Sequence, residues 1–261
     1  MTMKTTLLLG LLCATAGLPV ADASANVAAA VPVAAMGVDA SQILAEVDKR
    51  AAAFSDQSYK ASMEIIKSGQ LKKRLEFTAV MKGLDKQLIR FSAPGDVEGM
   101  KVLMEDASNL YLYLPEFKKV RRVAAHVQSQ GFLGSTFTYE HMTQVRLSPH
   151  FKAEMGGKEG SITTLILTPK DGVESSYSKI EITIDGSKGG VTRLRYYDST
   201  GADVLEQNRE EWVKIGEQLV PTRISMLNIK TGDLSVIKMT DIVVNQGVDD
   251  SIFSRRELLR E

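Results

Sequence analysis

The stretch that decides the fold covers residues 59–81 and reads YKASMEIIKSGQLKKRLEFTAVM. Apolar and polar residues alternate over residues 59–65 and again over residues 71–81, on either side of Gly69 and Gln70. A period of two places the apolar side chains of a strand on one face. The stretch therefore predicts two antiparallel strands that share one apolar face.

Many later segments have strand composition and are separated by turn residues such as Gly172, Gly186 and Gly201. The expected strands are residues 87–92, 101–105, 110–114, 120–123, 151–155, 161–168, 179–185, 191–198, 202–213, 219–228 and 234–244. Such a series of short, regularly spaced strands predicts a mainly β fold of the α+β class, built as a curved meander or an open barrel.

Residues 39–54 predict one amphipathic helix ahead of the strands. Asp39 or Ser41 can cap it. Its apolar positions recur at steps of three and four residues, which is the helical period; they are Ile43, Leu44, Val47, Ala51 and Phe54.

Residues 124–142 keep no sustained period, so we expect a loop with short helical turns, either a lid over the sheet or a plug in its open end.

The N-terminus has the three parts of a secretory signal, namely Lys4, an apolar run over residues 7–18 and small residues that follow. We expect a cleavable signal at residues 1–25, a flexible leader at 26–38 and a single domain at 39–261, exported to the periplasm. Cys13 is the only cysteine and lies in the expected signal. The mature chain is therefore expected to have neither a disulfide nor a thiol nucleophile.

Charge and motifs exclude several classes of function. The chain has 32 basic and 32 acidic residues, which gives no overall footprint for nucleic acid. It contains no nucleophile-elbow, P-loop, dinucleotide-binding or zinc-protease motif. The three histidines, His126, His141 and His150, are far apart in the sequence. We therefore expect no enzyme activity, no cofactor and no metal.

Two basic clusters, residues 72–74 and 118–122, allow two interpretations. They are either solvated strand edges that discourage pairing with other sheets or a cationic rim that receives a phosphate headgroup. Methionines fall largely on or beside the expected strands, where they either pack in the core or adapt to variable acyl chains.

Three motifs carry a resemblance to a known family: FSAPGDVEGMKVL at residues 91–103, LYLYLPEFKKVRR at 110–122 and GFLGSTFTYE at 131–140. Shorter matches follow at residues 212–216, 219–222, 230–232 and 250–254. In order and spacing these motifs resemble the outer-membrane lipoprotein-sorting proteins, relatives of the carrier LolA and its receptor LolB. The resemblance covers nearly the whole expected mature chain.

The resemblance implies a strongly curved antiparallel sheet that forms an incomplete barrel, with its apolar concave face covered by an N-terminal helix, short helices and loops. It implies a carrier of a lipid or acylated protein that makes transient contact with a membrane, and many similar proteins are encoded beside RND-type inner-membrane exporters. Thr136 and His141 stand where the family usually has aspartates, so contacts made by those carboxylates are not carried over.

We expect six apolar residues to line the lipid-binding cavity or its cover: Phe77, Met81, Leu103, Leu112, Phe132 and Phe137. Four residues are expected at a headgroup or lid site: Arg121, Arg122, Tyr139 and Glu140. The first hypothesis is a non-enzymatic periplasmic carrier that exchanges an acyl chain with an envelope transporter or outer-membrane acceptor. An accessory protein of an exporter with a self-filled cavity is the alternative, and an unrecognised hydrolase is a third.

Overall fold

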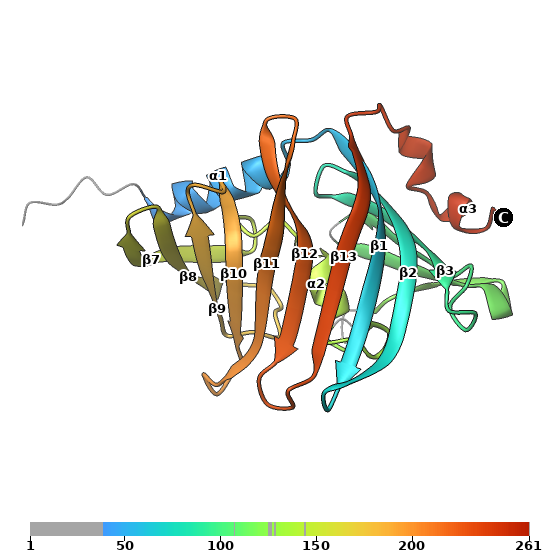
Figure 1. Ribbon diagram of the computed structural model, residues 1–261, viewed down its shortest axis with the longest axis horizontal. Helices are drawn as coiled ribbons and strands as arrows, with labels where there is room; N and C mark the ends of the chain where they lie inside the picture. The colour runs from blue at the N-terminus through green and yellow to red at the C-terminus, as the bar shows by residue number, and fades with distance from the viewer. Residues whose placement is uncertain (1–38, 107, 125–126, 128, 144, 261) are drawn as a thin grey trace, which may run out of the picture. The chain divides into compact units, whose positions relative to one another are not determined.

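The computed structural model describes residues 39–260 except 107, 125–126, 128 and 144. The expected signal and leader, Cys13 and His126 therefore lie outside the described residues. Within them the chain forms short helices and one large antiparallel sheet (Figure 1).

The strands of this sheet are β1 Asp56–Lys67, β2 Gln70–Lys82, β3 Lys86–Ala93, β4 Lys101–Asp106, β5 Asn109–Leu114, β6 Lys119–Arg122, β7 Phe151–Glu159, β8 Ile162–Pro169, β9 Lys179–Asp185, β10 Gly190–Tyr197, β11 Asp203–Ile215, β12 Gln218–Asn228 and β13 Leu234–Val244. The described α-helices are α1 Ala40–Ala51, α2 Tyr139–Thr143 and α3 Arg255–Leu258. Single 3₁₀ turns form at η1 Pro115–Phe117, η3 Phe132–Gly134 and η4 Asp250–Ile252.

The sheet is open, with β6 and β7 as its two edge strands. The order is β6-β5-β4-β3-β2-β1-β13-β12-β11-β10-β9-β8-β7. The chain starts in the middle with β1, steps outward to one edge at β6, crosses to the other edge at β7, and returns to place β13 beside β1. The mainly β, antiparallel and unclosed fold expected from the sequence is confirmed.

The alternation that predicted the first two strands is confirmed over most of their length, but Leu71 at the start of β2 is 54% exposed. In β1 the buried apolar residues are Ala61, Met63 and Ile65, and in β2 they are Leu75, Phe77, Ala79 and Met81. Cross-strand partners share a face, and Ala61 is opposite Phe77. These side chains belong to the main core cluster or line its cavities, on the face of the sheet that we call the inner face.

Strands β3 to β5 are buried on both faces, which was not predicted from the sequence. Val102, Leu103 and Met104 are each at most 1% exposed. Val102 and Met104 join the main cluster. Leu103 instead joins a second cluster on the outer face, with Leu88 and Tyr111 and with Phe253 and Leu258 from the C-terminal segment. A continuous apolar run is typical of a strand covered on both sides.

The C-terminal segment forms this outer cover. Asp249 accepts a hydrogen bond from the Ser251 N–H at 2.7 Å and caps η4. Asp250 then pairs with Lys82 at 3.0 Å and with Lys86 at 3.2 Å, which attaches η4 to β2 and β3. Figure 1 shows α3 on the opposite side of the sheet from α1 and α2.

Helix α1 packs on the inner face, beside β7 and β10. The Asp39 carboxylate accepts from the Ser41 N–H at 3.0 Å and begins the helix. Leu44 is buried, and the buried Asp48 accepts from the backbone N–H groups of Leu147 and Ser148 at 3.0 and 2.7 Å. These two bonds attach the helix to the segment that leads into β7.

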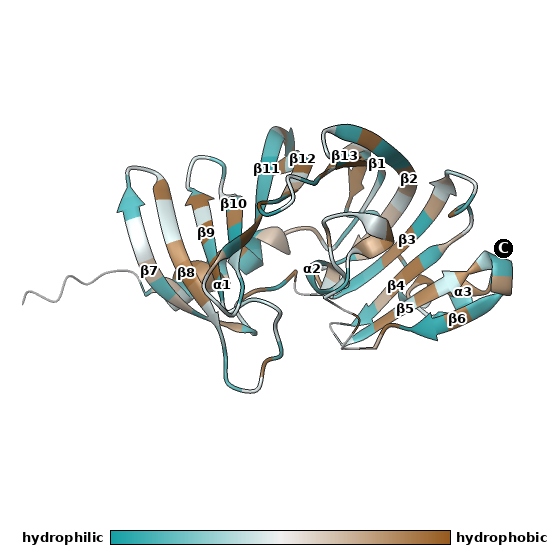
Figure 2. Cartoon of the chain, turned by 90° about the horizontal axis from the view of Figure 1, so that it is seen from below, coloured by the Kyte–Doolittle hydropathy of each residue, from teal (hydrophilic) through white to brown (hydrophobic). Residues whose placement is uncertain are grey.

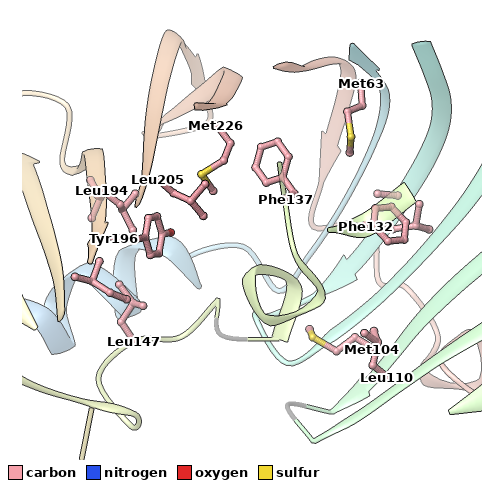
Figure 3. Close-up of a cluster of buried hydrophobic side chains, with 14 of the residues drawn as sticks. Met63, Met104, Leu110, Phe132, Phe137, Leu147, Leu194, Tyr196, Leu205 and Met226 are labelled. Carbon is pink, nitrogen blue, oxygen red and sulfur yellow. The ribbon is translucent and has the colours of Figure 1, made fainter. Parts of the chain in front are cut away.

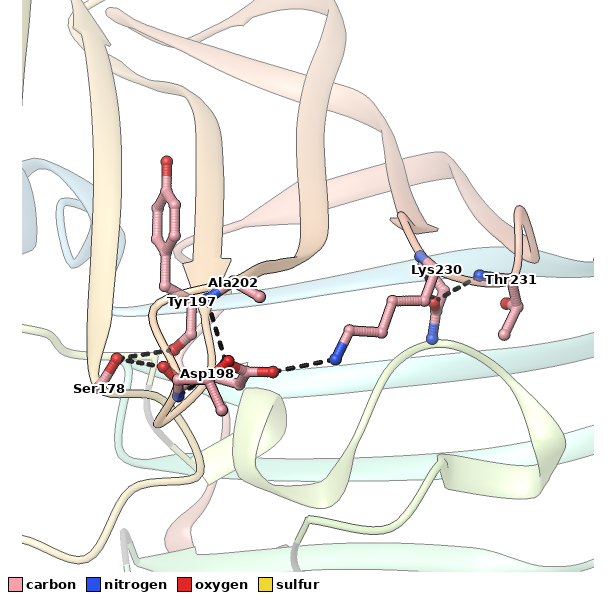
Figure 4. Close-up of polar contacts among 8 residues, drawn as sticks. Ser178, Tyr197, Asp198, Ala202, Lys230 and Thr231 are labelled. Carbon is pink, nitrogen blue, oxygen red and sulfur yellow. Dashed lines mark hydrogen bonds and ion pairs between the residues drawn. The ribbon is translucent and has the colours of Figure 1, made fainter.

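Asp198 connects two neighbouring turns at one end of the sheet (Figure 4). Its carboxylate accepts from the backbone N–H groups of Thr200 and Ala202 and from Lys230 at 3.0 Å. These hydrogen bonds lower the pKa of Asp198, first through the Thr200 side chain and then through Lys230. The turn between β10 and β11 is thereby attached to the turn between β12 and β13.

The outer cover gives a matched pair of neighbouring leucines for a stability test. Leu258 is fully buried in the second cluster, whereas Leu259 is 57% exposed. We expect Leu258→Ala to reduce the free energy of unfolding by about 2–5 kcal/mol, because the change leaves a cavity in a packed site. Leu259→Ala should stay within about 0.5 kcal/mol of wild type. Urea unfolding of both variants measures the difference, and equal losses would contradict the cover.

Candidate functional site

Two adjoining cavities lie on the inner face of the sheet. Cavity A has a volume of about 200 Å³ and cavity B of about 270 Å³. Each is smaller than the ~300–1,000 Å³ of typical ligand sites, but the two share a wall. The residues that line both are Tyr59, Gln87, Val145, Arg209, Ile224 and Met239.

A row of side chains across four strands forms the floor of cavity A. Arg209 on β11 is opposite Ile224 on β12, Ile224 is opposite Ile237 on β13, and Ile237 is opposite Met63 on β1. Since directly paired residues share a face, all four side chains are on the inner face. They line cavity A together. The row is apolar except at its Arg209 end.

An aromatic series closes cavity A on the other side. The ring of Phe77 lies 5.3 Å from that of Phe91, Phe91 lies 5.8 Å from Phe132, and Phe132 lies 5.3 Å from Tyr139 in an edge-to-face contact. Figure 3 shows Phe137 between Met226 and Met63. Phe132 and Phe137 come from residues 131–143, which we call the cover segment, and which Figure 2 shows between the two halves of the sheet.

Steric constraints explain why glycine occupies positions 131 and 134 of the cover segment. A β-carbon at Gly131 would lie 2.7 Å from the Ser135 carbonyl oxygen, and Gly134 has a φ of 81°. Gly131 also bridges to Thr138, and the Phe132 N–H donates to the Phe137 carbonyl at 2.7 Å. The family motif at this position therefore builds a tight loop that presents Phe132 and Phe137 to the interior.

Thr136 fastens the cover segment to the sheet. Its N–H donates to the Ser235 hydroxyl at 3.0 Å, and its own hydroxyl donates to the Met226 carbonyl at 2.8 Å. Ser235 is 0% exposed. The neutral hydroxyl of Thr136 suits this site, because its partners are a backbone carbonyl and a hydroxyl group.

His141 is a neutral histidine enclosed by aromatic rings. The Thr138 N–H donates to its Nδ1 at 3.0 Å, so the ring proton is on Nε2, which donates to the Tyr177 hydroxyl at 3.0 Å. Its ring stacks on Tyr177 at 5.6 Å and meets Tyr196 at 5.0 Å. Burial lowers the pKa of His141 to about 3.

Tyr139 and Glu140, both expected at a headgroup or lid site, hold the cover segment. Burial raises the pKa of Tyr139, whose ring contacts Phe132. Glu140 is 4% exposed and accepts from the Ser175 hydroxyl at 2.8 Å and from the Ser176 N–H at 3.2 Å. The carboxylate thus connects α2 to the segment that precedes β9.

The structure brings together four of the six residues expected to line the interior. Phe77, Phe132 and Phe137 line cavity A, and Met81 lines cavity B. Leu112 packs against the main cluster. The prediction for Leu103 is wrong, because its side chain is on the outer face under the C-terminal cover. Whether any of the six binds lipid stays a prediction.

Arg121 and Arg122 are exposed and face opposite sides of the edge strand β6. Arg121 is opposite Leu112, which packs on the inner cluster, and Arg122 is opposite Tyr111 in the outer cluster. Arg122 donates to the Ser108 carbonyl at 3.2 Å. In the described part of the chain, neither arginine lines cavity A or B.

The sequence reasoning missed Gln207 and Arg209. Both are on β11 and line cavity A, and the Nε of Arg209 donates to the Gln207 side chain at 3.0 Å. Their positions two and four residues after the buried Leu205 were the available signal, since they place polar groups on an apolar face.

Within residues 39–260 and outside the gaps named above, no group of three or more histidine, cysteine or acidic side chains is arranged to hold a metal ion. None of the helices described in that range is long and apolar enough to span a membrane.

The neutral state of His141 predicts a pH dependence of stability. An unfolded histidine takes up a proton near pH 6.5, whereas folded His141 does so only near pH 3. The folded state therefore loses about 1.4 kcal/mol per pH unit as the pH falls below 6.5. His141→Gln should remove this loss, so its stability should fall by about 2 kcal/mol less than that of wild type between pH 7 and pH 5. Urea unfolding at both pH values tests this, and equal losses would refute the assignment.

Comparison with known proteins places this fold. A family model described as "-like: Uncharacterized protein" matches residues 83–260, more than half of the chain. No curated protein matches the sequence. Similar solved structures include a DUF1329 family protein from Desulfovibrio piger, with 23% identity, 84% of this chain and 97% of that chain covered, and a TM-score of 0.78.

Two further solved structures carry the family resemblance. An outer membrane lipoprotein-sorting protein domain from Vibrio parahaemolyticus is 21% identical, with 85% and 98% of the two chains covered and a TM-score of 0.76. The LolA superfamily protein NE2245 from Nitrosomonas europaea is 17% identical, with 85% and 100% covered and a TM-score of 0.70. The chain therefore belongs to the family of the matching model, and its fold confirms the resemblance to LolA/LolB-like proteins that the sequence motifs indicated.

Proposed function

We propose that this chain is a non-enzymatic periplasmic carrier that shields an acyl chain in cavities A and B. The observation that carries the proposal is the pair of adjoining cavities with mainly apolar walls on the inner face of an open sheet. The fold shared with an outer membrane lipoprotein-sorting domain supports it. Fold similarity alone does not identify a cargo.

The energetics suit transport. Burying ~14–16 methylenes at about 0.8 kcal/mol each gives roughly 11–13 kcal/mol before the costs of association. That is enough to keep an acyl chain out of water and small enough to permit transfer to a membrane. Methionines in the walls, including Met63, Met142 and Met239, can adjust to acyl chains of different shape.

The cover segment is the part that would move during loading. Thr136 and Glu140 hold it through hydrogen bonds, while Phe132 and Phe137 fill space beside cavity A. A ligand that replaced these rings would keep the interior filled. This arrangement supports exchange of the cover for cargo, although a permanently closed cover would fit the rival accessory protein with a self-filled cavity.

The proposed partners are a lipid or acylated protein, a membrane in transient contact and an RND-type inner-membrane exporter. A shallow surface depression lined by Arg122, Arg255 and Arg256 together with Tyr111, Val120 and Leu259 supports contact with an anionic surface. Arginine side chains are well suited to phosphate groups. Native mass spectrometry after gentle purification tests for a bound lipid, and a protein that never retains one favours the accessory role.

Filling cavity A should weaken cargo binding. Ile237 is on the floor of this cavity, so the larger ring of Ile237→Trp would occupy the space of an acyl chain. We expect the variant to fold and to lose at least tenfold in affinity for a fluorescent fatty acid. Fluorescence titration gives the affinity, and circular dichroism checks the fold.

Ile162→Trp is the matched control for the cavity-filling variant. Ile162 is 36% exposed on β8 and lines neither cavity A nor cavity B in the described structure. The control should bind the probe as wild type does. Unchanged binding by folded Ile237→Trp would overturn the proposed cavity.

Arg121 and Arg122 are predicted to respond unequally, because β6 turns them to opposite faces. Arg121→Ala, on the inner face, should weaken cargo retention or transfer about tenfold, in line with the ~1.5–3 kcal/mol of a hydrogen bond to a charged group. Arg122→Ala, on the outer face, should leave cargo retention nearly unchanged. Lipid retention measured on each variant decides the matter, and two silent substitutions in folded protein would reduce the cluster to a solvated strand edge.

A further inference from the structure

Arg209 is a cation in the wall shared by the two cavities. It is on the inner face of β11 and lines both cavity A and cavity B. The side chain is half-buried, and it also lines a third, smaller cavity of about 70 Å³ together with His141 and Tyr196. The Nε atom donates to Gln207 at 3.0 Å. Over the described residues, no carboxylate forms an ion pair with its guanidinium.

Other arginines of this part of the sheet are paired. Arg195 on β10 pairs with Asp203 and with Glu206, and Arg223 on β12 pairs with Glu210. Arg223 directly precedes Ile224 on β12, and successive strand residues face opposite sides of the sheet. Arg223 therefore faces away from the cavities. The unpaired guanidinium is thus the one on the inner face, where a charge is most costly to leave without a partner.

Nearby groups do not neutralise this charge. Burial lowers the pKa of Arg209, but a guanidinium stays protonated in proteins. Burial also raises the pKa of Tyr196, so its phenol is neutral and supplies no counter-charge. Gln207 accepts one N–H and leaves the two terminal amino groups of the guanidinium for another partner.

The polar groups that both cavities share are few and converge on the same wall. Besides Arg209 they are Tyr59 and Gln87, while Val145, Ile224 and Met239 are apolar. Burial raises the pKa of Tyr59 to about 12, which keeps its hydroxyl a hydrogen-bond donor. A small set of donors in an otherwise apolar cavity is typical of a site that fixes the head of an amphipathic ligand.

We propose that the Arg209 guanidinium binds the anionic head, a carboxylate or a phosphate, of a single-chain amphiphile whose acyl chain lies along Ile224, Ile237 and Met63. This inference rests on the proposed carrier function and specifies its ligand class. The planar guanidinium matches two oxygens of either anion. The head is therefore buried between the cavities, and the cargo has one negatively charged head.

Isothermal titration with three ligands of equal chain length tests the proposal. The ligands are hexadecanoate, hexadecyl phosphate and neutral hexadecanamide, each added to the purified protein. Wild type should bind at least one anion about tenfold or more tightly than the amide, as expected for a charged hydrogen bond. The two anions distinguish a carboxylate head from a phosphate head.

Two variants assign the preference to Arg209. Arg209→Gln should lose the preference for the anion and keep the affinity for the amide. Arg223→Gln removes the same charge from the outer face of the neighbouring strand and should keep the preference. Arg209→Lys retains a charge without the fork and should bind the anion with intermediate affinity.

The outcomes separate this inference from the proposed function. Equal binding of anions and amide by wild type overturns the head site and leaves the carrier intact. Binding of none of the three ligands overturns the carrier, and the head site with it. If Arg209→Gln fails to fold, the comparison of ligands on wild type and the Arg209→Lys variant still decide.

Discussion

The pairing of β1 with β13 is the interaction on which the rest of the structure depends. It joins the strands that the chain builds first and last, over partners from Gln57 to Ile66. Asp56 reinforces it, because its carboxylate accepts from the backbone N–H groups of Gln246, Gly247 and Val248. Without this pairing β1–β6 and β7–β13 would be two separate sheets. The row of side chains under cavity A crosses this junction, so the site exists only in the joined sheet.

Different segments of the chain cover the two faces of the joined sheet. On the outer face the C-terminal segment covers β3 to β5 with Phe253 and Leu258, which pack on Leu88 and Leu103. On the inner face α1 and the cover segment fill part of the interior but leave cavities A and B. The outer cover is therefore a packed element of the core. The inner cover borders empty space, and the proposed exchange with cargo depends on that difference.

The sequence predicted those features that depend on local pattern. The alternation in β1 and β2 identified the inner residues Phe77 and Met81 correctly, because a single buried face produces a clear period of two. Leu103 was placed on the wrong face, since the apolar run through β4 reads the same whichever cover each side chain meets. Arg209 was missed because its alternation with Leu205 indicates only a shared face, whereas its place beside Ile224 follows from the pairing of β11 with β12 in the folded sheet.

The two basic groups of the site, His141 and Arg209, respond to burial in different ways. His141 adapts to burial by losing its proton, and its neutral ring then satisfies Thr138 and Tyr177. An arginine cannot lose its proton in this way, because its guanidinium stays protonated in proteins. The neighbouring arginines are paired, whereas the inward guanidinium of Arg209 forms no ion pair with a carboxylate among the described residues. An anionic head would form an ion pair with that guanidinium, and an acyl chain would fill the apolar cavity beside it. One amphipathic ligand would therefore satisfy both the charge and the apolar surface of the inner face.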